Sequence, residues 1–200
     1  MPMSKLRRAL AWFVDFALVV AGASALAVLT FHRVSALVAD VPALAARSGL
    51  ELLTSRGDFI KASAELGLAL WNKSVLYVEQ AFGLLILGTF LYQWAALAFT
   101  GSTIGKALLG LKVAPVVPSA PRRAVLRAAV TTTADVAVYA LACVLLFEGQ
   151  FVLSTLVWAT AVLVFAGNAL PVLSPSRRSL ADRLAGTAVT GIELGRGDRG

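Results

Sequence analysis

The sequence predicts an all-α integral membrane protein, a four-transmembrane-helix bundle with both termini in the cytoplasm. Of its 200 residues, 58% are hydrophobic and 14% are charged, and the mean hydropathy is +0.81. A soluble domain is closer to half apolar and a quarter charged. Four runs approach or exceed the roughly 20 apolar residues that a helix needs to cross about 30 Å of hydrocarbon. Basic residues are distributed unevenly around these runs, and together the observations argue against a soluble enzyme.

Each predicted span is a run with at most one charged residue, and the four cover residues 10–31, 81–99, 128–147 and 151–170. The last two are separated by Glu148, Gly149 and Gln150. This spacing predicts a tight antiparallel hairpin, because glycine lets the backbone reverse. A cleaved signal peptide is the alternative interpretation of the first run. It is disfavoured because the run continues well beyond the usual length and contains Asp15.

The orientation follows from the Lys and Arg residues outside the spans. Thirteen of them, with three acidic residues, fall on the side that holds both termini and the loop 100–127, whereas the other side holds five, with six acidic residues. Basic short loops are retained in the cytoplasm, so we expect both termini to be inside. The basic face is then expected to contact anionic lipid headgroups. Because this face is explained by the membrane, we expect no nucleic-acid partner.

The two longer connections are expected to lie at the membrane surfaces. In the outer loop 32–80, apolar and charged residues alternate, which predicts one or two amphipathic helices, one of them over 59–71 with Asp58 as its N-cap. After the second span, residues 101–113 predict a short interfacial amphipathic segment, in which Lys106 and Lys112 meet headgroups or an acid.

Two acidic residues lie inside the predicted spans, Asp15 in the first and Asp135 in the third. A carboxylate in hydrocarbon costs roughly 3 kcal/mol, so each requires compensation. Both lie roughly 8 to 10 Å below the inner boundary at about 1.5 Å per residue. We therefore expect a shared polar pocket, in which the partner of Asp15 is a cation from another segment: Lys106, Arg123, Arg127, Arg178 or Arg183.

Polar residues in the spans are expected to face the interior of the bundle. The third span repeats one every four residues, which predicts a polar stripe on one helix face: Arg127, Thr131, Asp135, Tyr139 and Cys143. Gln93 and Asn168, in the second and fourth spans, are expected to hydrogen-bond between helices. With one histidine and one cysteine in the chain, we expect no disulfide, no metal centre and no cofactor.

Three segments, taken in order, resemble the RDD family of bacterial membrane proteins. They are Arg8-x-x-Ala11-x-x-x-Asp15, then Thr103-x-Gly105-Lys106 continuing to Val113, and finally Arg178 to Thr187. The resemblance implies a single membrane domain over 1–190, followed by a flexible tail over 191–200, in a bacterial cell membrane. It also implies that the family arginine and first aspartate are Arg8 and Asp15, and that the second aspartate is Asp182. Asp135 is the alternative, favoured by burial but not by the local motif.

The resemblance implies transport of ions or small solutes for some members. We accordingly expect a small ion or solute transporter in which Asp15, alone or together with Asp135, handles a cation or proton. We expect it to assemble as a homo-oligomer, because four helices enclose little room. The alternative is a non-transporting adaptor or assembly factor for other membrane proteins, with structural Arg and Asp residues. We expect no enzyme activity. Asp182, flanked by Arg178 and Arg183, is expected to dock beneath the bundle and exchange partners with the Arg8 and Asp15 region.

Overall fold

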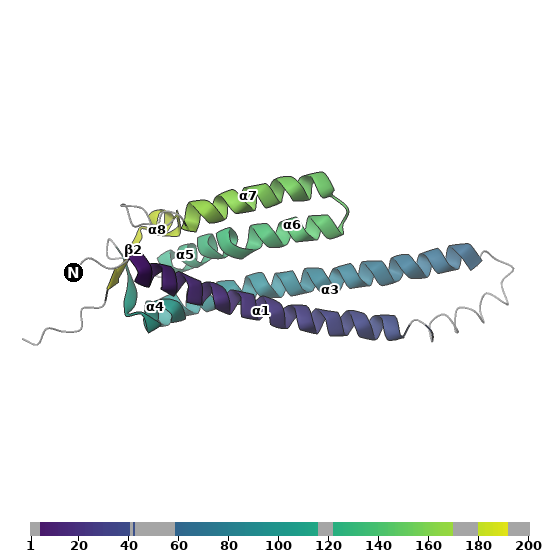
Figure 1. Ribbon diagram of the computed structural model, residues 1–200, viewed down its shortest axis with the longest axis horizontal. Helices are drawn as coiled ribbons and strands as arrows, with labels where there is room; N and C mark the ends of the chain where they lie inside the picture. Colours follow the sequence, from purple (N-terminus) through teal and green to yellow (C-terminus); the bar gives the residue numbers. More distant parts are fainter. Residues whose placement is uncertain (1–4, 41, 43–58, 116–121, 170–179, 192–200) are drawn as a thin grey trace, which may run out of the picture. The chain divides into compact units, whose positions relative to one another are not determined.

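The computed structural model describes residues 5–40, 42, 59–115, 122–169 and 180–191 (Figure 1). The described chain is helical apart from one two-stranded sheet. Four helical segments are long and apolar enough to cross a membrane, which confirms the predicted class. The chain divides into two compact units, one formed by residues 1–22 and 85–200 and the other by residues 23–84.

The first two helices are longer than the predicted spans. Helix α1 (Lys5–Ala39) has 35 residues and α3 (Phe59–Ala95) has 37. At about 1.5 Å per residue, each exceeds 50 Å, against about 30 Å of hydrocarbon. The prediction of separate amphipathic helices in the outer loop is therefore wrong for the described residues, since 32–39 continue α1 and 59–80 continue α3. No proline interrupts either continuation. Asp58, the predicted N-cap, lies outside the described residues.

The 23–84 unit contains the later part of α1 and the earlier part of α3, which run antiparallel (Figure 1). The guanidinium carbon of Arg33 lies 5.8 Å from the centroid of the Tyr77 ring. This cation–π contact links the two helices.

The third and fourth spans form the predicted hairpin (Figure 1). The third consists of α5 (Arg122–Thr132), the π-helical turn η2 (Thr133–Ala137) and α6 (Val138–Phe147), and the fourth is α7 (Phe151–Ala169). Gly149 reverses the chain with a φ of 79°, and the Gln150 amide donates to the Leu145 carbonyl at 2.8 Å. Such a left-handed residue with a back-bonded amide is a common helix end. Across the hairpin, the Ser154 hydroxyl donates to the Ala142 carbonyl at 2.7 Å.

Small residues lie inside the described structure and large apolar ones outside. The buried apolar residues are mostly alanines. In contrast, Phe99 is 82% exposed, Val152 78% and Leu163 73%. A soluble protein does not expose so many large apolar side chains in continuous helices. Membrane helices approach one another through small residues and present large ones to lipid, which is the arrangement found here.

The segments next to the membrane ends of the spans form a small α/β layer. After α3 come the π-helical turn η1 (Ala96–Thr100), the short helix α4 (Ile104–Leu108) and strand β1 (Leu111–Pro115). Strand β1 pairs antiparallel with β2 (Thr187–Gly191), which follows helix α8 (Leu180–Ala185). Helix α8 packs against α5.

This layer corrects part of the prediction of an interfacial segment over 101–113: Ile104 and Leu108 of α4 are exposed at 48% and 71%, as an interfacial segment requires, but Leu111 is not. Leu111 is only 1% exposed, so it cannot dip into lipid, and it is paired with Gly191 in the sheet. Strand pairing satisfies backbone groups that a surface segment would leave to water. Gly191 therefore belongs to a strand, and the remainder of the predicted flexible tail, 192–200, lies outside the described residues.

Candidate functional site

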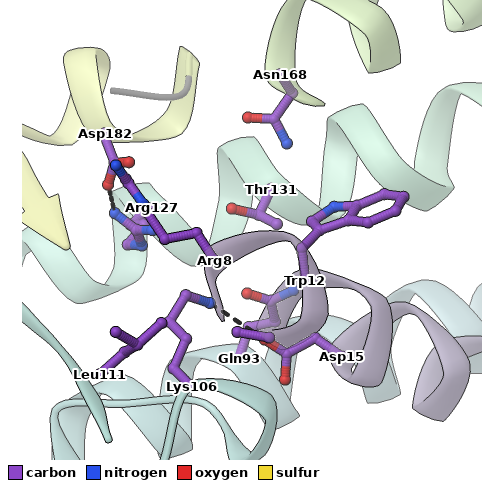
Figure 2. A pocket seen from close by; sticks show the side chains of 11 residues that line it. Arg8, Trp12, Asp15, Gln93, Lys106, Leu111, Arg127, Thr131, Asn168 and Asp182 are labelled. Carbon is purple, nitrogen blue, oxygen red and sulfur yellow. Dashed lines mark hydrogen bonds and ion pairs between the residues drawn. The ribbon is translucent and has the colours of Figure 1, made fainter. Parts of the chain in front are cut away.

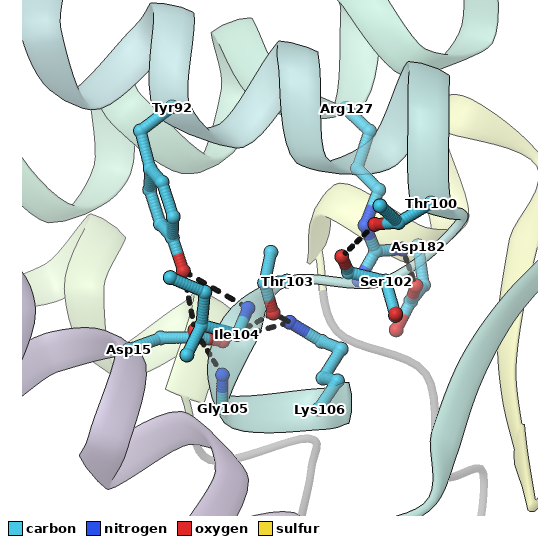
Figure 3. A network of polar contacts seen from close by, with 10 residues as sticks. All are labelled: Asp15, Tyr92, Thr100, Ser102, Thr103, Ile104, Gly105, Lys106, Arg127 and Asp182. Carbon is cyan, nitrogen blue, oxygen red and sulfur yellow. Dashed lines mark hydrogen bonds and ion pairs between the residues drawn. The ribbon is translucent and has the colours of Figure 1, made fainter. Parts of the chain in front are cut away.

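The carboxylate of Asp15, buried at 7% exposure, accepts four hydrogen bonds (Figure 3). The Tyr92 hydroxyl donates to Oδ1 at 3.1 Å and the Gly105 amide at 2.9 Å. The Thr103 hydroxyl donates to Oδ2 at 2.5 Å and the Lys106 ammonium at 3.2 Å. A carboxylate offers about four acceptor positions, so all of them are occupied. We call these five residues the Asp15 cluster.

Asp15 caps a helix that belongs to another segment. Thr103 is the N-cap residue of α4, yet its side chain makes no capping bond. Asp15 supplies the capping oxygen by accepting from the Gly105 amide, a role usually filled by the N-cap side chain itself. The Thr103 hydroxyl instead donates to Asp15 and accepts from the Lys106 ammonium at 2.8 Å.

Glycine at position 105 permits the close approach of α4 to α1. A Cβ atom on this residue would lie 2.2 Å from the carbonyl oxygen of Ala11 and 2.9 Å from Oδ1 of Asp15. No side chain fits at the first distance. The spacing Thr103-x-Gly105-Lys106 thus places three donors around the Asp15 carboxylate: a hydroxyl, a backbone amide and an ammonium.

Lys106 is the cation that pairs with Asp15, and it is one of the five candidates predicted from the sequence. Burial lowers the pKa of the Lys106 ammonium, and the negative charge of Asp15 opposes that effect. The Lys106 ammonium of this pair therefore releases its proton more readily than the ammonium of an exposed lysine.

We expect Tyr92→Phe to lower the free energy of unfolding by about 1–2 kcal/mol, because the Tyr92 hydroxyl serves two partners. It donates to Asp15 and accepts from the Ile104 amide at 3.0 Å. Unfolding in detergent, followed by circular dichroism, measures the change. Tyr77→Phe is the matched control, since its ring contact with Arg33 does not need the hydroxyl. Equal effects of the two substitutions would contradict the assigned role of Tyr92.

A second charged group forms around Asp182 on α8. Asp182 is 2% exposed and forms an ion pair with the Arg127 guanidinium of α5, itself 6% exposed. Figure 2 shows the Arg8 side chain, also buried, pointing toward Asp182. Arg8 therefore points away from Asp15, although both residues are on α1. We call Arg8, Arg127 and Asp182 the Asp182 cluster.

Two of the other predicted basic residues, Arg123 and Arg183, are within the described chain. The Arg123 guanidinium donates to the Gly186 carbonyl at 3.2 Å, which ties α5 to the end of α8. Arg183 is exposed. Arg178 lies outside the described residues.

A cavity of about 70 Å³ separates the Asp15 and Asp182 clusters (Figure 2). Its wall includes three cationic and two acidic side chains, so its formal charge is +1. The residues that line it are Arg8, Ala11, Trp12, Asp15, Gln93, Lys106, Leu111, Arg127, Thr131, Asn168 and Asp182. They come from all four spans and from the α/β layer.

Asp135, which was predicted to share a polar pocket with Asp15, is not among the residues that line this cavity. Instead, Asp135 accepts a hydrogen bond from the Asn168 amide at 3.1 Å. Asn168 lines the cavity, and its carbonyl accepts from the Ala181 amide at 3.4 Å. Asp135 lies a turn farther along the third span than Thr131, and Asn168 links it to the cavity wall.

The polar stripe of the third span contains a feature that the sequence did not reveal. Asp135 lies in the π-helical turn η2, which holds more residues per turn than an α-helix. The wider turn reduces the angular drift of residues spaced four apart. Beyond it, the Tyr139 ring packs edge-on against Phe165, with 6.2 Å between centroids, and Cys143 is half-buried.

Sequence reasoning missed Tyr92 and Gly105 as partners of Asp15 and gave Gln93 the wrong role. Gln93 was expected to hydrogen-bond between helices, but among the described residues its carboxamide has no partner and it faces the cavity. The available signals were a tyrosine next to a glutamine in the second span, and the glycine in Thr103-x-Gly105-Lys106.

The RDD family model matches residues 3–186, nearly the whole chain. The chain belongs to the RDD family. The match confirms the resemblance found in the three sequence segments, and in this RDD protein it covers both clusters and the cavity between them. Comparisons with curated proteins and with solved structures gave no match.

Arg8, Asp15 and Asp182, the residues predicted to be the family arginine and aspartates, all line the cavity. Asp135 does not. The assignment of the second family aspartate to Asp182 remains a prediction. The position of Asp182 on the cavity wall favours it over Asp135.

Proposed function

We propose that this RDD-family protein is a transporter of a small ion or solute in the bacterial cytoplasmic membrane, with both termini inside. The observation that carries the proposal is the cavity, whose wall holds five charged side chains. Ion pairs that only fasten helices together need packed contacts and no space between them. Charged groups around a space within membrane helices usually mark a pathway for ions or polar solutes.

The Asp15–Lys106 pair suggests how a proton and a cation would be exchanged. The Lys106 ammonium occupies Oδ2 of Asp15, and burial favours release of its proton. Neutral Lys106 leaves that oxygen to a cation. One positive charge then replaces another, so the formal charge of the cavity wall is unchanged. The Thr103 hydroxyl, which touches both groups, would stay beside the incoming cation.

Proton flux driven by a cation gradient tests the proposal in proteoliposomes. We expect wild-type protein to carry flux and Asp15→Asn to lower it about tenfold or more, because the carboxamide lacks the negative charge that holds the cation. Asp40→Asn is the matched control, since Asp40 is exposed at the end of α1. Circular dichroism and gel filtration confirm that each variant is folded. Undiminished flux in folded Asp15→Asn would refute the role of Asp15.

One observation favours a second candidate, a membrane adaptor or assembly factor in which these residues are structural. All four acceptor positions of Asp15 are already occupied by donors of the protein. On this proposal, purified protein carries no flux above empty liposomes and copurifies with another membrane protein. Neither proposal involves an enzymatic reaction or a cofactor.

A further inference from the structure

Asp135 is a carboxylate inside the membrane-spanning helices that has no ion-pair partner within the described chain. Its hydrogen bond comes from the neutral amide of Asn168, at 3.1 Å to Oδ1. A carboxylate offers about four acceptor positions, so most of those on Asp135 are unused among the described residues. Asp15 differs, because its four positions are occupied and it pairs with Lys106. A carboxylate left in this state within hydrocarbon requires a proton or a cation.

The Thr131 hydroxyl connects Asp135 to the cavity. Thr131 lines the cavity and precedes Asp135 by four residues, so the two side chains lie one turn apart on one face of the third span. Within the described chain this hydroxyl makes no hydrogen bond. A hydroxyl can donate one proton while it accepts another. Asn168 also joins Asp135 to the cavity wall, but hydrogen bonds on both sides of its carboxamide hold it in place.

Water in the cavity can carry a proton from Lys106 to Thr131. A volume of about 70 Å³ has room for more than one water molecule. Gln93 is only 6% exposed, lines the same wall and has no hydrogen-bond partner in the described chain. Water commonly satisfies buried polar groups of this kind. In the view of Figure 2, Gln93 lies between Thr131 and the Asp15–Lys106 pair, which places a water-binding group along the route.

The charges near Asp135 favour a transfer of the proton from Lys106. The Lys106 ammonium of α4 and the Asp15 carboxylate of α1 both interact electrostatically with Asp135. Its titratable neighbour on the third span is Tyr139, and its neighbour on α7 is the neutral Asn168. Moving one proton from Lys106 to Asp135 turns two poorly solvated charges into two neutral groups, which lowers the desolvation cost. The charge then left unpaired on Asp15 attracts the incoming cation.

We propose that Asp135 is the proton acceptor of the cation–proton exchange and that the Thr131 hydroxyl relays the proton to it. An N–H bond of the Lys106 ammonium breaks as cavity water accepts the proton. Water gives a proton to the Thr131 hydroxyl, which gives its own to Asp135, where an O–H bond forms. Lys106 becomes a neutral amine and Asp135 a neutral carboxylic acid. The inference rests on the proposed function and deepens it, because it names the group that holds the proton while the cation occupies Asp15.

Infrared difference spectroscopy tests the proposal, because a carboxylic acid and a carboxylate absorb in separate bands. The full chain in liposomes, at constant pH and ionic strength, is switched from choline chloride to the chloride of lithium, sodium, potassium or magnesium. We expect at least one of these cations to produce a carboxylic-acid band. Asp135→Asn should abolish this band and Asp135→Glu should shift its frequency, whereas a residue with a purely structural role would produce neither change.

Variants of Thr131 test the route of the proton. Thr131→Val keeps the shape of the side chain and removes the hydroxyl, so the band should form about tenfold more slowly or less after rapid mixing. Thr131→Ser should restore the rate. Thr133→Val is the matched control, because Thr133 is an exposed threonine of the same span, and it should leave the rate unchanged. If Thr131→Val does not fold, Thr131→Ala removes the same hydroxyl.

A band that appears with none of the cations, or that persists unshifted in folded Asp135 variants, would refute Asp135 as the acceptor. Equal rates in wild-type protein and in folded Thr131→Val would refute the relay. Because the spectra measure no flux, their failure is separable from that of the proposed function. Cation-driven flux without the band would exclude Asp135 and leave the transporter proposal standing, whereas the band without flux would support the proton transfer and overturn the transporter proposal.

Discussion

Gly105→Ala is expected to destabilise the protein by about 3–5 kcal/mol, because overpacking adds to the loss of hydrogen bonds to a buried carboxylate. The new Cβ atom would lie 2.2 Å from the Ala11 carbonyl oxygen, so α4 must move away from α1. That movement separates Asp15 from the Gly105 amide and from the residues on either side of it. Unfolding in detergent, followed by circular dichroism, measures the loss.

Gly88→Ala is the matched control for Gly105→Ala. Nothing lies within 4 Å of a Cβ atom on Gly88, which is inside α3. Alanine is the better helix former, so we expect a gain of up to about 1 kcal/mol. If the two alanine variants were equally stable, the close approach of α4 to α1 would be disproved.

Asp182→Ala is expected to cost about 3–5 kcal/mol, because it leaves the buried guanidinium of Arg127 without its carboxylate. The loss should also release α8 and β2, which a protease assay detects as faster cleavage of the C-terminal segment. Asp40→Ala is the control, since Asp40 is exposed. Replacing both partners, as in Arg127→Met with Asp182→Leu, should cost less than the single Asp182→Ala change. A double variant whose loss equals the sum of its single losses would contradict the ion pair.

The expected exchange of partners between the tail and the Arg8–Asp15 region is tested by a separate cycle. Asp15 and Asp182 lie in different clusters on one cavity, so exchange requires their energies to be coupled. Additive losses in the double variant Asp15→Asn with Asp182→Asn would rule out the exchange.

The spans could be predicted because length and hydropathy decide whether a helix crosses a bilayer. The ends of α1 and α3 could not, because without proline nothing local stops a helix when it leaves the hydrocarbon. The sheet was also beyond prediction. Strands β1 and β2 have five residues each and are separated by more than seventy residues, so their pairing depends on the tertiary fold.

The charged members of the site could be predicted for a related reason. A buried charge requires a partner, which puts Lys106 and Arg127 among the five candidate partners of Asp15, whereas Asp182 is expected only from the family resemblance. Tyr92 and Gly105 carry no charge, and they are 77 and 90 residues from Asp15. A hydroxyl or a backbone amide is not distinguishable by type from the many others in the chain. Only the packing of α3 and α4 against α1 selects these two.

The pairing of β1 with β2 has a consequence for how the protein is made. Strand β2 and helix α8 are the last described parts to leave the ribosome, and α8 carries Asp182. Until they emerge, one wall of the cavity is missing, and Arg127 has not met its partner. A nascent chain with all four spans already inserted therefore still lacks a finished site. The site can close only after α8 and β2 have left the ribosome.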